Sequence, residues 1–171
     1  AIVLSSAISG LFFADLRTSQ QLGYVVQSKL KTSFHVREIA FLVQGTAATP
    51  DAVSDSILTF VGDIPQKLAN ISDAEFANYV ASLHQQLLER PPSVEDPDSG
   101  LGSQIFGEIE QNCTSDFHYN EKLAAALLAI TKDDVQALGN AIVDSNGPYG
   151  RLLVQVWGRA QAPMPEPMSL Q

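Results

Sequence analysis

The run FADLRTSQQLGYVV, residues 13–26, joins two different hydrophobic patterns. Before it, apolar residues recur at the spacing of one helical face, which predicts a helix over residues 2–15. That face consists of Leu4, Ile8, Leu11 and Phe12. After it, an alternating pattern predicts a strand over residues 24–30. The polar residues that follow Leu16 predict a turn, and Gly23 gives the backbone the freedom to end it.

The chain beyond this junction begins with a second strand and a helix. Residues 36–44 carry apolar side chains on both faces, which is typical of an interior strand. A helix is expected from Thr49-Pro50, because a hydroxyl cap there precedes a proline at the first helical position. Pro65 has no backbone N–H to donate, so we expect that helix to kink or break near residue 62.

Helix signals dominate the second half of the chain. Ser72 and Glu75 have the spacing of a capping box, which predicts a helix that ends before Pro91-Pro92. The remaining expected elements are helices over residues 101–109 and 120–130, a helix capped by Thr131, and a final strand over residues 151–157.

This order of elements predicts an α+β fold, with helices packed on one face of an antiparallel sheet. Three strands are few for so many helices, so we expect that the first strands of this domain are missing. Residues 1–158 are therefore predicted to form a single incomplete domain. Residues 159–171 are rich in proline and are predicted to be a tail or a linker.

The composition excludes several classes of function. A net charge of −9 opposes binding to nucleic acid, which needs a basic face, and weakly opposes an anionic membrane surface. The longest apolar runs fall short of the roughly 20 residues that span a bilayer. Cys113 is the only cysteine, which suits a reducing compartment. We therefore expect a cytoplasmic location, with the mitochondrion as the alternative.

The residues that usually carry catalysis do not form a known motif in this chain. The three histidines, His35, His84 and His118, are too far apart for a helical zinc pair, and neither H-E-x-x-H nor H-x-x-E-H occurs. A single cysteine makes no cysteine-based metal site, and Cys113 is best interpreted as a buried free thiol. We expect the chain to bind no metal and to cleave nothing by itself.

One motif does resemble a known family. The run LRTSQQLGYVV, residues 16–26, resembles a motif in the last of four homologous domains of the pitrilysin/insulysin zinc metallopeptidases, the family of insulin-degrading enzyme and nardilysin. Supporting similarities are FLVQ at 41–44, FGEI at 106–109 and TKDDV at 131–135. The resemblance covers about residues 2–158 and implies a metallopeptidase-like homology domain that lacks its first strands.

The resemblance implies a function for the junction. In this family a zinc site lies in the first domain, and two halves enclose a peptide chamber. The last domain closes on the first and adds substrate contacts, so peptides and the N-terminal catalytic domains are the implied partners. By match to the motif, Arg17 and Tyr24 would reach the peptide backbone near the scissile bond, with Tyr24 assisting at the carbonyl oxygen. Phe13 would pack against the substrate.

Two alternatives remain open at this point. In the first, both residues are purely structural: Arg17 complements a helix dipole, and Tyr24 reflects the preference of aromatic residues for strands. The chain could also be a non-catalytic binding or assembly module, which recruits a partner strand or a second copy through an unpaired sheet edge.

Overall fold

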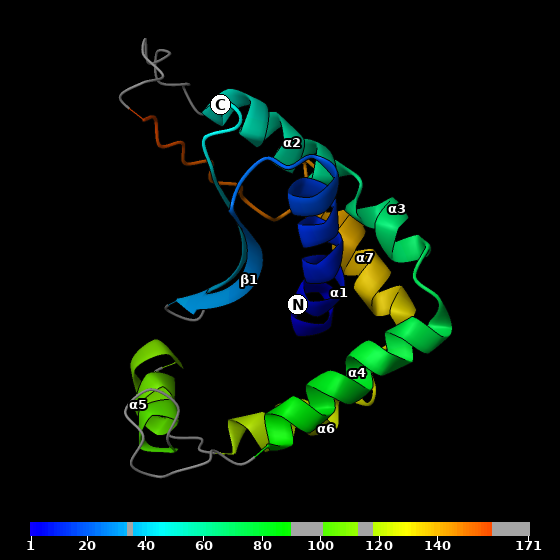
Figure 1. Cartoon of the computed structure of the whole chain (residues 1–171). Helices are drawn as coiled ribbons and strands as arrows, with labels where there is room; N and C mark the ends of the chain where they lie inside the picture. The colour runs from blue at the N-terminus through cyan, green and yellow to red at the C-terminus, as the bar shows by residue number, and fades with distance from the viewer. Residues whose placement is uncertain (34–35, 90–100, 113–117, 159–171) are drawn as a thin grey trace.

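The computed structural model describes residues 1–33, 36–89, 101–112 and 118–158. A long N-terminal helix continues into a π-helix and is followed by a hairpin and a series of helices (Figure 1). The elements are α1 (Ile2–Phe13), η1 (Ala14–Ser19), β1 (Val25–Ser33), β2 (Val36–Gln44), α2 (Pro50–Gly62), α3 (Ile64–Ala69), α4 (Asp73–Leu88), α5 (Leu101–Asn112), α6 (Tyr119–Leu127) and α7 (Lys132–Val143). This arrangement confirms the predicted α+β class.

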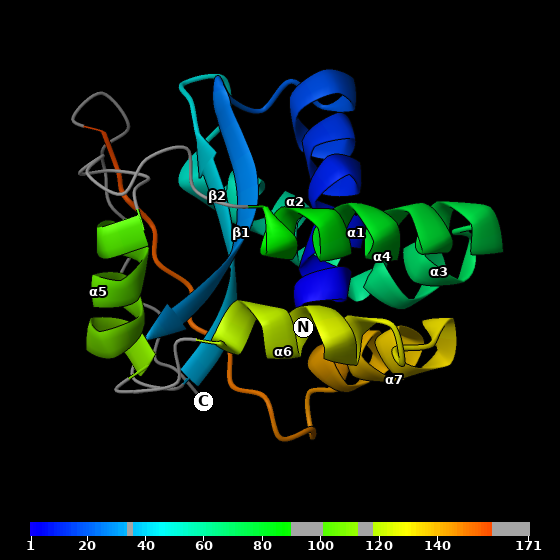
Figure 2. The same cartoon turned by 90° about the horizontal axis from the view of Figure 1, so that it is seen from below.

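The two strands form an antiparallel hairpin in one continuous register. The pairs run from Val25 with Gln44 to Ser33 with Val36. Val26 and Ser28 are buried on one face of this sheet, and their partners are Val43 and Phe41. α1 packs against this face, whereas α5 lies beyond the strands on the side away from α1 (Figures 1 and 2).

An aromatic cluster joins α1, the sheet and α2. The ring of Phe12 lies 5.0 Å from that of Phe41 and 5.1 Å from that of Phe60, measured between centroids. Phe12 and Phe60 are almost completely buried. These tilted and edge-on arrangements are the favourable ones for aromatic pairs, each worth about 0.5–1.5 kcal/mol beyond the area that it buries. α1 is therefore the central element of the core.

Local signals in the sequence set the starts of the helices. The Thr49 hydroxyl accepts a hydrogen bond from the backbone N–H of Ala52 at the start of α2. Complete capping boxes open two later helices. They are Ser72 with Glu75 at α4, and Thr131 with Asp134 at α7.

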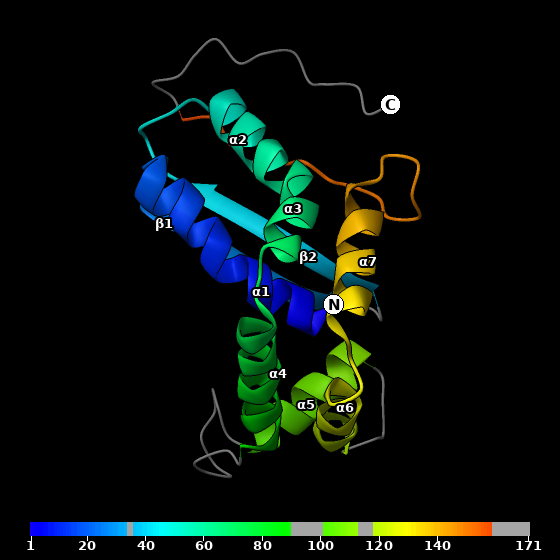
Figure 3. The ribbon, with the colours of Figure 1, turned by 90° about the vertical axis from the view of Figure 1, so that its right-hand side faces the viewer.

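The predicted break near residue 62 is also confirmed. α2 ends at Gly62 and α3 begins at Ile64, so that Pro65 falls in the first turn of a new helix. There its missing N–H costs no helical hydrogen bond. Further along the chain α3 lies beside α7, and α4 lies beside α6 (Figure 3).

The strand predicted over residues 151–157 is wrong. The segment alternates between more and less exposed side chains, but it is not assigned to any sheet in the described residues. Its Gln155 side chain instead donates hydrogen bonds to Asp51 and Ser54 on α2. A strand requires a neighbouring backbone to pair with, and the β-branched composition of a segment cannot supply that neighbour.

Candidate functional site

The junction between α1 and β1 is helical for longer than the sequence predicts. The helical backbone does not stop after residue 15 but widens into η1, where the N–H of Gln20 donates to the carbonyl of Asp15 at 2.9 Å. The Ser19 hydroxyl donates to the Ala14 carbonyl at 3.2 Å. Leu16 remains fully buried on the core side. Such π-turns are rare and occur frequently at functional sites.

The chain leaves η1 through a strained residue. Gln21 has a φ of 52° and is the only described residue, glycines included, with a positive φ. The left-handed conformation at the end of the turn therefore falls at Gln21 and not at Gly23, where the sequence predicted it. This left-handed conformation costs a residue with a side chain of the order of 1 kcal/mol. The Leu22 N–H then donates to the Leu16 carbonyl at 3.0 Å, which folds the exit of the junction back onto η1.

A close crossing of two glycines fixes the start of β1. A Cβ atom on Gly23 would lie 2.4 Å from the carbonyl oxygen of Gln44, and one on Gly45 would lie 2.5 Å from the Cα of Gly23. Both contacts are with backbone atoms, which cannot rotate away as a side chain can. The next residue, Tyr24, donates its N–H to the same Gln44 carbonyl at 3.0 Å. The backbone of Tyr24 is therefore held tightly.

The side chains of the three predicted site residues point to the surface of this rigid junction. Tyr24 is 63% exposed and Arg17 is exposed. Neither side chain has a hydrogen bond or an ion pair with another described residue. Arg17 lies in the last turn of η1, where its charge also complements the helix dipole.

The structure separates the two neighbouring phenylalanines. Phe12 is completely buried in the aromatic cluster, whereas Phe13 is 49% exposed. Of the two rings, only that of Phe12 belongs to the core. Phe13 is therefore free to contact another molecule, together with the exposed side chains of Arg17 and Tyr24.

Sequence reasoning missed the residues that brace the junction. The Asp15 carboxylate accepts a hydrogen bond from the Gln20 side chain at 2.9 Å and forms an ion pair with Lys67 of α3 at 3.5 Å. Lys67 is 52 residues away in the sequence, so no local pattern could reveal this contact. No local pattern reveals the need for glycine at position 45 either, because it arises from the close approach of the Gly23 backbone.

The described residues do not fit a metal ion. No group of three or more histidine, cysteine, aspartate or glutamate side chains in this part of the chain is arranged to hold one. Cys113 and His35 fall outside the described residues. His118 lies on the surface, where its ring nitrogen is 2.7 Å from Glu121.

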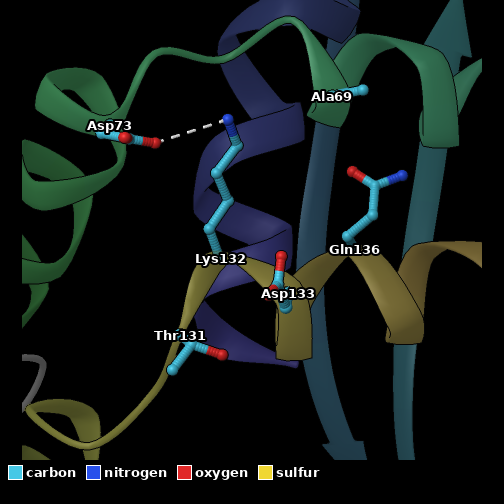
Figure 4. A pocket seen from close by; sticks show the side chains of 6 residues that line it. All are labelled: Ala69, Asp73, Thr131, Lys132, Asp133 and Gln136. Atoms are coloured by element: carbon cyan, nitrogen blue, oxygen red, sulfur yellow. Dashed lines mark ion pairs between the residues drawn. The ribbon is translucent and has the colours of Figure 1, made fainter.

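A shallow open pocket lies away from the junction, where α3, α4 and α7 meet (Figure 4). Its volume is about 510 Å³, and it is lined by Ala69, Asp73, Thr131, Lys132, Asp133 and Gln136. Lys132 pairs with Asp73 at 3.6 Å, and the Gln136 amide donates to the Pro65 carbonyl at 2.8 Å. These contacts connect the ends of three helices, and we interpret the pocket as a structural joint.

Comparison with known proteins shows the family to which the chain belongs. Residues 3–99 match the family model for the C-terminal lobe domain 4 of PQQ synthase PqqF-like proteins, which is more than half of the chain. A nardilysin-like protein of Arabidopsis thaliana is 31% identical over 147 residues, covering 85% of this chain and 14% of that protein. The chain belongs to the pitrilysin/insulysin family.

Other members of the pitrilysin/insulysin family agree with this assignment. The insulin-degrading enzyme of Drosophila melanogaster is 28% identical over 151 residues, which is 88% of this chain and 15% of that protein. The crystal structure of pitrilysin has the same fold, with a TM-score of 0.68 and 19% identity over 82% of this chain and 14% of that one. The chain thus spans about one seventh of the length of these relatives and corresponds to their C-terminal region.

None of the helices in the described ranges is long and apolar enough to cross a membrane. One relative in Arabidopsis thaliana, 22% identical over 72% of this chain, is named as peroxisomal.

Proposed function

We propose that this chain is the substrate-contacting C-terminal domain of a zinc metalloendopeptidase that degrades peptides. The observation that carries the proposal is the junction itself. It presents Arg17 and Tyr24, without partners among the described residues, from a backbone that η1 and the glycine crossing hold in place. Side chains with free donors on a rigid support are what a binding site needs, and family membership supplies the peptide as the ligand.

Arg17 would bind the peptide backbone or a carboxylate. A guanidinium offers five N–H donors and no acceptor, so a carbonyl or carboxylate oxygen is its natural partner. The chain carries a net charge of −9, but no acidic side chain in the described residues forms an ion pair with Arg17. Its guanidinium is therefore available to a ligand.

Tyr24 would donate its phenolic hydrogen to the carbonyl oxygen of the scissile bond as negative charge develops there. One well-placed donor of this kind is worth up to about 3–4 kcal/mol of transition-state stabilisation. Phe13 would add apolar contact with a substrate side chain. When another domain closes over this surface, water leaves and these contacts become stronger, so that catalysis would depend on closure.

We further propose that the N-terminal part of the full-length protein holds the zinc ion and that this chain binds none. Cleavage of peptides would then require both parts. The single cysteine favours a reducing compartment, so we propose a cytoplasmic or mitochondrial location.

Kinetics of the full-length protein on a peptide substrate test this function. Tyr24→Phe is expected to lower kcat by about tenfold to a hundredfold, because it removes one transition-state donor. Tyr149→Phe is the matched control, since Tyr149 is also exposed, at 49%, but lies after α7. Arg17→Ala is expected to lower kcat/KM. Unchanged kinetics in both Tyr24→Phe and Arg17→Ala would show that the assigned roles are wrong.

A second candidate function, assembly through a β-strand, is favoured by the segment over residues 151–157. Leu152, Val154 and Val156 are 80%, 73% and 85% exposed and lie on the same side of this extended segment. An exposed apolar row on unpaired extended backbone is a template for another strand. In this case the chain would form a homo-oligomer or recruit a partner strand.

Size-exclusion chromatography with light scattering separates this candidate from a purely catalytic role. A concentration-dependent dimer that Val154→Lys abolishes would support assembly, because a charge on an edge strand opposes pairing. A strict monomer at high protein concentration would rule out the homo-oligomer.

A further inference from the structure

We propose that Asp15 and Lys67 are positioning residues that hold η1 in its π-helical form and thereby direct Arg17 towards the peptide. The inference rests on the proposed function of Arg17, and it concerns residues to which neither the motif nor the family match assigns a role.

The Asp15 carboxylate joins two parts of the chain. One oxygen, Oδ1, accepts a hydrogen bond from Nε2 of Gln20 at 2.9 Å, and the other, Oδ2, lies 3.5 Å from Nζ of Lys67. The backbone of the same two residues is also joined, because the Gln20 N–H donates to the Asp15 carbonyl at 2.9 Å. Asp15 therefore closes the wide turn through both its main chain and its side chain.

Lys67 anchors this turn to the core. It projects from α3, and its ammonium lies 5.1 Å from the centre of the Phe60 ring, a distance at which a cation is attracted to an aromatic face. Phe60 in turn contacts Phe12 of α1. The Lys67 and Asp15 side chains are only 27% and 30% exposed, so solvent weakens this pair less than a fully exposed one. The contact thus connects η1 to the aromatic cluster.

Arg17 lies within the turn that this contact closes. An α-helix advances by about 100° per residue, so a change of η1 from π-helical to α-helical hydrogen bonding would turn the residues within and after it around the axis. Arg17 has no partner of its own among the described residues to resist such a rotation. Its direction therefore depends on the contacts that Asp15 makes on either side of it.

The test combines variants in the full-length protein with peptide kinetics. Asp15→Asn and Lys67→Met remove the charges and retain the approximate shapes of the side chains. Each is expected to lower kcat/KM about fivefold in the native background but by less than twofold in an Arg17→Ala background, because the pair acts through Arg17. Lys132→Met is the matched control, since Lys132 is similarly exposed and paired at 3.6 Å but belongs to α7.

The same factor of loss in both backgrounds would overturn the inference, because it would indicate a general structural effect. No loss in either background would also overturn it. Hydrogen exchange provides a readout that does not depend on activity. The Gln20 and Leu22 amides, which donate within the junction, should exchange at least fivefold faster in Asp15→Asn than in the native protein, and unchanged rates would show that Asp15 does not hold η1.

The outcomes also separate this inference from the proposed function. If Arg17→Ala leaves the kinetics unchanged, the proposed role of Arg17 is wrong, and with it the claim that the pair directs Arg17 to a peptide. If Arg17→Ala lowers kcat/KM whereas Asp15→Asn and Lys67→Met do not, only the positioning role is wrong.

Discussion

Replacing Gly45 by alanine would force apart the two chain segments that cross at the start of β1. The new Cβ would lie 2.5 Å from the Cα of Gly23 and 2.6 Å from the carbonyl oxygen of Leu22. Carbon atoms in contact prefer about 3.5–4.0 Å, so the two backbones would have to separate by roughly 1 Å. Overpacking of this kind typically costs about 1–3 kcal/mol.

Urea unfolding followed by circular dichroism measures this cost as a loss in the free energy of unfolding. The control is Gly10→Ala within α1, where a Cβ would meet nothing within 4 Å. Because alanine favours helix more than glycine does, this control should stabilise the protein by about 0.5–1 kcal/mol. The two glycine-to-alanine changes are thus expected to have opposite signs.

Two outcomes would refute this account of the crossing. If Gly45→Ala were as stable as the native protein, the segments would not be in close contact. If Gly10→Ala were destabilised as much as Gly45→Ala, the effect would not come from the crossing. Because Tyr24 donates to the carbonyl of Gln44 beside Gly45, Gly45→Ala should also weaken peptide cleavage in the full-length protein.

Two further predictions concern buried hydroxyls and helix caps. Ser28→Ala is expected to stabilise the protein by about 1 kcal/mol, because the buried Ser28 hydroxyl has no hydrogen-bond partner among the described residues. Ser54→Ala should destabilise the protein, since the Ser54 hydroxyl donates to the Pro50 carbonyl at 2.8 Å and accepts from the Gln155 side chain. Denaturant midpoints of the two variants would test this difference, and equal shifts would contradict it. Hydrogen bonds from the Ser72 side chain and backbone hold the pKa of Glu75 below its ordinary value of 4.5, and those from Thr131 hold the pKa of Asp134 below 3.8. A carboxyl whose pKa is lowered by folding contributes stability above its unfolded pKa and loses it as the pH falls through its folded pKa. Thermal unfolding should therefore show the start of α4 weakening below about pH 4.5 and the start of α7 weakening below about pH 3.8. A Glu75→Gln, Asp134→Asn double variant should lose less stability over that range, and an identical acid profile would refute the assignment.

Local chemistry explains the parts of the fold that the sequence predicts well. Thr49, Ser72 and Thr131 cap helices through contacts within three residues. The break before α3 depends only on where Pro65 can be accommodated. The hairpin follows from alternating apolar residues that one face buries against α1. Such features are readable because the interacting residues are close together in the chain.

The remaining features depend on contacts that sequence patterns do not contain. The polar residues after Leu16 predict a turn, but Leu16 is buried, and η1 satisfies the backbone while it keeps that side chain inside. The segment over residues 151–157 has the composition of a strand but no paired neighbour in the described part of the chain. For the site, the motif identified Arg17 and Tyr24, whereas their support from Lys67 and Gly45 becomes visible only in three dimensions.

The glycine crossing has a consequence for the fidelity of folding. A slip of the β1–β2 hairpin by one residue would bring either Gln44 or Thr46 to the place where Gly45 crosses Gly23. Both residues carry a Cβ that the crossing has no space for, and the same slip would turn every side chain of the strand to the opposite face. The crossing therefore excludes misregistered hairpins sterically during folding. A site whose geometry depends on Tyr24 is thus protected against errors in strand pairing before any ligand arrives.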